Sequence, residues 1–153
     1  MPFLSFETML FPLSFVLSAL LLGAAASGML LGHWYLIDRD LSLRPLEHTA
    51  SMYNGLLVVQ AGLLAVTIAL SVLFGAAATP AAVAELLRGH SALLAARVAV
   101  SPFGAGVLGW MISKTLDVPQ TMAATGLFYI AVLAVMVGEL LGRFLLFRTG
   151  LPL

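Results

Sequence analysis

The 153-residue chain contains no cysteine. This excludes disulfides, cysteine-ligated iron–sulfur clusters, thiolate zinc sites and a cysteine nucleophile on the chain. Charge is scarce as well, because Asp, Glu, Lys and Arg make up only 9% of the residues, against roughly a quarter in an ordinary soluble domain. Seven basic residues balance seven acidic ones, and no two basic residues are adjacent. The sequence therefore lacks the basic footprint of nucleic-acid binding, and we exclude nucleic acid as a partner.

Apolar residues make up 61% of the chain. A hydrocarbon core about 30 Å thick takes roughly 20 apolar residues per spanning helix. The sequence predicts an all-α integral membrane four-helix bundle, a single transmembrane domain over 1–153 with spans at about 11–37, 48–77, 91–112 and 122–147. Membrane-barrel strands would alternate polar and apolar residues, and the run GLLVVQAGLLAVTIALSVLF does not.

The first apolar run contains the small residues of a signal-peptide cleavage site, Ala24 to Ala26. It is preceded by Glu7 and no basic residue, and it continues to Ile37, so we expect a retained first span. Four spans place both termini on one membrane face. That face collects Arg88, Arg143 and Arg148, with Arg97 just inside, against Arg39, Arg44 and Lys114 on the other. The positive-inside rule then predicts cytoplasmic termini, in a bacterial cytoplasmic membrane.

Glycine recurs at every fourth position in the predicted spans, as in Gly28-xxx-Gly32 and Gly138-xxx-Gly142. Residues 104–109 also match the dinucleotide fingerprint G-x-G-x-x-G. That motif binds a pyrophosphate only where it joins a strand to a helix, whereas here it lies inside an apolar helix. Small residues let membrane helices approach closely, and we predict this packing role for all three segments.

Three charged residues, Arg97, Glu139 and Arg143, lie inside the predicted spans, where a charge costs roughly 2.5–3.5 kcal/mol on insertion scales. Arg97 and Glu139 each lie about two turns inside the same membrane face. Glu139 and Arg143 are four residues apart on one helix, the favourable order for an ion pair. We predict that the three side chains pair. Their role is either a buried ion pair that fixes helix register, or a relay for protons or substrate in a small transporter or proton channel.

The opposite face carries a second cluster of polar and aromatic residues, which we call the histidine face: His33, Trp34, Tyr35, Arg39, Glu47 and His48. The two histidines lie at matched depth on neighbouring helices. A quinone site needs a donor to each carbonyl, a titratable group and an apolar or aromatic wall, and these residues supply all three. The sequence predicts a quinone site here, with haem b ligated by both histidines as the alternative. A polar loop at the lipid head groups, with no ligand, is the third interpretation.

Within the last span, the segment Gly138-Glu139-Leu140-Leu141-Gly142-Arg143-Phe144 resembles a stretch of the membrane anchor subunits of the dimethyl sulfoxide reductase and polysulfide reductase type. Those anchors are longer, with more spans, and pass electrons between a quinone pool and an external iron–sulfur subunit. The resemblance implies an electron-transfer role and partner subunits. The segment LGHWYLIDRDLSLRPLEH does not match that family's pattern.

We therefore expect a small membrane subunit of a respiratory or other electron-transfer complex, contributing to or bordering a quinone site. Its partners would be the lipid bilayer and other membrane subunits. The chain is not expected to be an enzyme by itself, since no serine, histidine and acid can be placed together with an oxyanion site. The alternatives are a small transporter or proton channel, and a purely structural membrane subunit.

Overall fold

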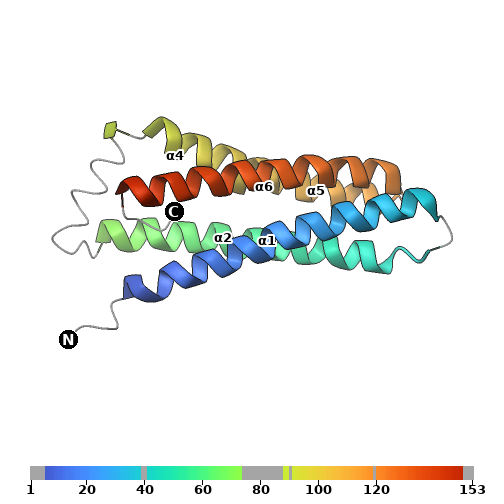
Figure 1. Cartoon of the computed structure of the whole chain (residues 1–153), viewed down its shortest axis with the longest axis horizontal. Helices are drawn as coiled ribbons and strands as arrows, with labels where there is room; N and C mark the ends of the chain where they lie inside the picture. The colour runs from blue at the N-terminus through green and yellow to red at the C-terminus, as the bar shows by residue number, and fades with distance from the viewer. Residues whose placement is uncertain (1–5, 39–40, 74–87, 90, 119, 150–153) are drawn as a thin grey trace.

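A computed structural model describes residues 6–38, 41–73, 88–89, 91–118 and 120–149 (Figure 1). Helix α1 is Phe6–Ile37, α2 is Arg44–Leu73, and α6 is Thr121–Thr149. A third rod is built from α4 (Ser91–Val98), the π-helix η1 (Ala99–Ala105) and α5 (Gly106–Leu116). Long apolar runs form helices because a helix satisfies its own backbone hydrogen bonds in lipid. Four segments are long and apolar enough to cross a membrane, and the described residues contain no strand, which confirms the predicted all-α bundle.

Three helix boundaries differ by about a turn or more from the predicted spans. Helix α1 begins at Phe6 rather than near residue 11. Helix α2 begins at Arg44, about one turn earlier than expected, because Pro45 fits the first turn of a helix, where its missing N–H costs little. The fully buried Leu46 extends the packed core into that turn. The third rod continues to Leu116 rather than ending near 112. The predicted end of the second span, after residue 73, lies outside the described residues.

The four rods form a square in cross-section. Helix α1 packs against α2 and α6, and the third rod packs against the same two helices. Helices α2 and α6 therefore occupy opposite corners. The core between the rods includes Leu21, Tyr53, Ile112 and Phe128, all fully buried. The rings of Tyr53 and Phe128 meet edge to face, with centroids 6.2 Å apart, so an aromatic contact joins α2 to α6 across the middle.

Glycines set the spacing between α1 and α6. A Cβ added to Gly28 would overlap the Phe128 ring, and one added to Gly32 would overlap Thr125. The close approach predicted for Gly28-xxx-Gly32 is thereby confirmed. Residues 104–109 lie in η1 and α5, so the fingerprint match sits inside a helix and follows no strand in the described part of the chain.

The third rod is irregular at its centre. Segment η1 is a π-helix that contains Pro102, and proline cannot donate the backbone hydrogen bond that an α-helix needs at that position. Short π segments within helices recur at functional sites. In this chain the wide turn begins two residues after Arg97 and includes the buried Ser101.

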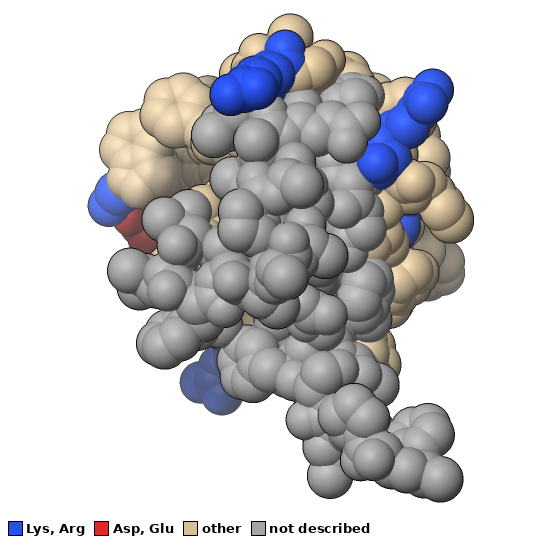
Figure 2. All heavy atoms as spheres, turned by 90° about the vertical axis from the view of Figure 1, so that its left-hand side faces the viewer, with Lys and Arg blue, Asp and Glu red and all other residues tan. Residues whose placement is uncertain are grey.

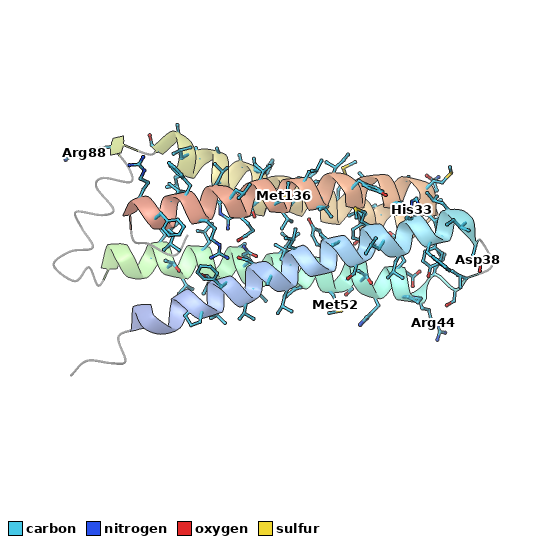
Figure 3. The ribbon with its side chains drawn as sticks, in the orientation of Figure 1. His33, Asp38, Arg44, Met52, Arg88 and Met136 are labelled. Carbon is cyan, nitrogen blue, oxygen red and sulfur yellow. The ribbon has the colours of Figure 1, made fainter. Side chains whose placement is uncertain are left out.

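Exposed basic side chains mark the two ends of the bundle. Arg88 and Arg148 are exposed at the end where α1 begins and α6 finishes, and Figure 2, which views this end, shows Lys and Arg side chains around its rim. Arg44 lies toward the opposite end, as do His33 and Asp38 (Figure 3). The stretch between is apolar on the outside, as a lipid environment requires. The cytoplasmic orientation of the termini stays a prediction.

Candidate functional site

Arg97 is a charged residue inside a membrane-spanning segment, and it is only 3% exposed. Helix α4 directs it toward α6, where its Nη2 donates a hydrogen bond to Oε1 of Glu139 at 3.2 Å. The two residues lie at the same depth, so the pairing predicted from their positions in the spans is confirmed. A buried charge pair of this kind is stable only if its remaining polar atoms also find partners.

Glu139 is the centre of a four-residue group, here called the Glu139 cluster, that also contains Gln60, Arg97 and Arg143. The side-chain amide of Gln60, on α2, donates to the same Oε1 that accepts from Arg97. On the other side, Arg143 Nη2 lies 3.7 Å from Glu139 Oε2, which confirms the predicted pair within α6. The carboxylate is thus held from α2, from α4 and from its own helix.

Helix α1 contributes an aromatic face to the cluster. The guanidinium of Arg143 stacks on the Phe15 ring, with its carbon 3.4 Å from the ring centroid. Such a cation–π contact stabilises a cation that has lost much of its water. All four rods therefore reach the Glu139 cluster.

Two small cavities adjoin the cluster. The first has about 20 Å³ of space for water and is lined by Ser14, Ser18, Gln60 and all three charged residues, among others. The second, of about 10 Å³, lies between Gln60, Arg97, Ser101 and Pro102. Each has room for about a single water molecule. Three buried polar atoms have no hydrogen-bond partner among the described residues: Gln60 Oε1, Arg97 Nε and Arg97 Nη1.

Gly138 makes room for Arg97. A Cβ at this position would lie 2.5 Å from Cβ of Ser101 and 3.0 Å from Nη1 of Arg97. The neighbouring Gly142 lines the larger cavity. The packing role predicted for Gly138-xxx-Gly142 is confirmed at Gly138, because the Arg97 guanidinium packs where a side chain at this position would lie.

Further polar contacts join α2 to the third rod, on the side of the cluster toward the histidine face. Tyr53 is fully buried, and its Oη donates to the carbonyl of Ala105 at 3.2 Å. The next residue on α2 contacts the third rod farther along its length: the amide of Asn54 donates to Ser113 Oγ at 2.9 Å and to the carbonyl of Gly109 at 3.3 Å. These polar groups lie along the interface between α2 and the third rod. Ser101 lies between them and Arg97.

Most side chains of the histidine face point outward rather than into a common site. His33, Trp34, Glu47 and His48 are all exposed, and Arg39 lies outside the described residues. His48 falls midway between the buried Leu46 and Ala50, which turns it to the outer side of α2. Among the described residues, no hydrogen bond or ion pair joins two members of this face.

Tyr35 is the exception, since it is buried and its Oη donates to the carbonyl of Ser42. An open cavity of about 750 Å³ adjoins it, a volume within the range of small-molecule sites, roughly 300–1,000 Å³. The cavity lies between the end of α1 and the start of α6, lined by Tyr35, Leu36, Leu41, Leu43, Gln120, Thr121, Met122 and Ala123. Neither His33 nor His48 is among these residues, and the quinone and haem roles of the two histidines stay predictions.

No group of three or more His, Asp or Glu side chains suited to a metal ion occurs within the described ranges. No family model, curated protein or solved structure matches the chain. The resemblance of residues 138–144 to reductase anchors therefore stays a prediction, and the functional argument rests on the geometry of the site.

Sequence reasoning missed Gln60 as a partner of Glu139, and it missed the Tyr53 and Asn54 contacts. One signal was present: Tyr53, Gln60 and Thr67 recur every seven residues on α2, a spacing that places polar groups on one face of a helix. The third rod has a matching four-residue repeat of Arg97, Ser101, Ala105, Gly109 and Ser113.

Proposed function

We propose that this chain is a small membrane transporter or channel, with the Glu139 cluster as the site through which a small ion or proton passes. One observation carries the proposal. Arg97 is almost fully buried, yet two of its donor atoms have no protein partner and adjoin cavities of water size. Charged residues inside a membrane mark ion and substrate pathways, and an arginine kept only to fix helix register is expected to have its donors satisfied.

Polar groups extend from the cluster toward both ends of the bundle. Ser14 and Ser18 on α1 line the cavity of about 20 Å³ beside the cluster. In the other direction lie Ser101, Tyr53 and the Asn54–Ser113 pair. These groups are polar side chains along α1, α2 and the third rod, and they support a path for a small ion. Each cavity holds about one water molecule. The geometry therefore favours a proton, or an ion about as large as a water molecule, over a larger solute.

The test is flux in vesicles that contain the purified protein alone. We expect proton or small-ion flux above that of empty vesicles. The double substitution Arg97→Gln with Glu139→Gln should lower it roughly tenfold or more, which requires little more than 1 kcal/mol on the transport barrier. Arg148→Gln is the matched control, because Arg148 is exposed at the end of α6 and lies outside the cluster. Flux from wild-type vesicles that equals the empty-vesicle leak would refute transport.

A second candidate is a quinone-linked subunit of a membrane electron-transfer complex, working with other subunits in a bacterial cytoplasmic membrane. The observation that favours it is the cavity beside Tyr35, which has mostly apolar walls and the Gln120 amide at its edge. The exposed histidines lie near this end, on outer faces where a partner subunit would complete the site. The isolated chain would then show no flux.

For this candidate we expect His33→Ala or His48→Ala to lower the quinone-linked turnover of the complex that co-purifies with the chain, because each removes a group able to exchange protons with a quinone. Met52→Ala is the control, since Met52 is exposed on α2 and outside the cavity lining. Unchanged turnover in both histidine variants would exclude His33 and His48 from the quinone site.

A further inference from the structure

We infer that the Glu139 cluster binds a small monovalent anion, of the size of fluoride or chloride, against the guanidinium of Arg97. The inference rests on the proposed transport function in one respect only: it names the class of ion that would pass. Binding itself can be measured without any transport. Charge, free donors and cavity size each support it.

The charges within the cluster do not cancel. Arg97 and Arg143 carry two positive charges, Glu139 carries one negative charge, and 2 − 1 leaves a net charge of +1. No other acidic side chain forms an ion pair with these arginines in the described part of the chain. An uncompensated charge in apolar surroundings is unfavourable, and a single monovalent anion would neutralise it.

The donors of Arg97 are available for an anion. Its side chain is 4% exposed, and of its three guanidinium nitrogens only Nη2 is used, by Glu139. Nε and Nη1 have no partner among the described residues, although Arg97 lines both small cavities. Arginine is the usual residue for binding anions in partly dry sites, because its donors form a rigid fork and it stays charged.

The acceptors near the cavities limit where the anion can lie. Gln60 Oε1 is buried without a partner and repels an anion, while its amide nitrogen is used by Glu139. The Glu139 carboxylate lines the first cavity and repels an anion as well. The anion therefore lies on the Arg97 side, away from the Gln60 oxygen and the carboxylate. On the α1 side, the hydroxyl of Ser18 donates to the Ser14 carbonyl at 2.8 Å and adds a polar wall.

Cavity size selects the ion. The cavity of about 20 Å³ beside the cluster holds an ion or molecule about as large as one water molecule. Fluoride and chloride are close to that size, whereas gluconate, which also carries a single negative charge, is much larger than this space. We therefore expect a halide-sized anion to bind, and larger anions of the same charge to be excluded.

The experiment measures thermal unfolding of the full chain in detergent, with sodium fluoride or chloride against sodium gluconate at equal ionic strength. We expect a halide to raise the midpoint by roughly 5–10 °C at about a hundred times its dissociation constant, and gluconate to have no such effect. Isothermal titration calorimetry with the same salts reports binding directly. An equal rise with gluconate would overturn the inference, because it would show a general salt effect.

Variants separate the site from the rest of the molecule. Glu139→Gln raises the net charge of the cluster to +2 and should bind the halide roughly tenfold more tightly. Arg97→Gln with Glu139→Gln leaves no unpaired carboxylate and keeps the net charge at +1 through Arg143, but it removes the Arg97 guanidinium. It should abolish the halide effect, because the donors of Arg97 hold the anion. Arg148→Gln should behave as wild type. A halide effect that persists in the double variant would place the anion elsewhere and refute the site.

Failure of this inference and failure of the proposed function give different results. Halide binding without flux would uphold the anion site and refute transport. Proton flux without halide binding would uphold transport and refute the anion. Halide flux that disappears in the double variant, together with halide binding in detergent, would support both.

Discussion

Replacing Arg97 with glutamine is expected to lower the free energy of unfolding by about 3 kcal/mol or more, because it removes the guanidinium 3.2 Å from the buried Glu139 carboxylate. Gln60 and Arg143 still contact that carboxylate, which places the loss at the lower end of the range for a broken buried pair. The measurement is reversible unfolding of the purified chain in mixed detergent micelles.

The double variant Arg97→Gln with Glu139→Gln is the decisive comparison. It removes both charges together, so no uncompensated carboxylate remains, and we expect it to recover most of the stability lost by Arg97→Gln alone. Arg148→Gln controls for the loss of one arginine at an exposed position. If the single and double variants were equally unstable, Glu139 would not be coupled to Arg97.

Gly28→Ala is the second substitution with a large expected effect, about 1–3 kcal/mol of destabilisation. The new methyl would overlap the ring of Phe128, which is fully buried and cannot move without disturbing the core. Unfolding in the same micelles would measure the loss. Changing Phe128 to leucine in the same chain should restore part of it, because the ring that the methyl meets is gone.

Gly23→Ala is the matched control for this substitution. It makes the same change in the same helix, at a position where an added Cβ meets nothing within 4 Å. Alanine there is expected to be neutral or to stabilise the helix by roughly 0.5–1 kcal/mol. Equal destabilisation by the two alanines would mean that α1 and α6 do not meet at Gly28.

Depth in the membrane could be predicted from the sequence, because each residue adds a fixed rise along a helix. The depths of Arg97 and Glu139 followed from counting residues from the ends of their spans, and the ion pair was correct. The four-residue spacing of Gly28 and Gly32 also identified the face of α1 that approaches α6.

Rotation about the helix axis could not be predicted for most residues. In a soluble bundle the apolar stripe marks the buried side, but lipid makes the outer surface as apolar as the core. Gln60 and His48 show the consequence. Both are polar residues on α2, yet Gln60 points into the Glu139 cluster while His48 lies on the outer side. The matched depth of the two histidines did not reveal that both side chains are exposed.

The π-helix at Pro102 was also beyond prediction from the residue pattern. Proline in a span indicates a distortion, but several local geometries can accommodate it. One of the two cavities beside Arg97 depends on that geometry, because Pro102 and Ser101 line it. No pattern in the sequence therefore predicted that the Arg97 nitrogens Nε and Nη1 would lack partners.

The order of the Glu139 cluster along the chain bears on how the protein is made. Gln60 is synthesised first, then Arg97, and Glu139 follows 42 residues after Arg97. During synthesis the third rod therefore enters the bilayer with its arginine not yet neutralised by the carboxylate, and only its apolar residues can offset a cost of roughly 2.5–3.5 kcal/mol. The carboxylate that neutralises Arg97 arrives only with α6, so α6 is expected to help hold the preceding rod in the bilayer.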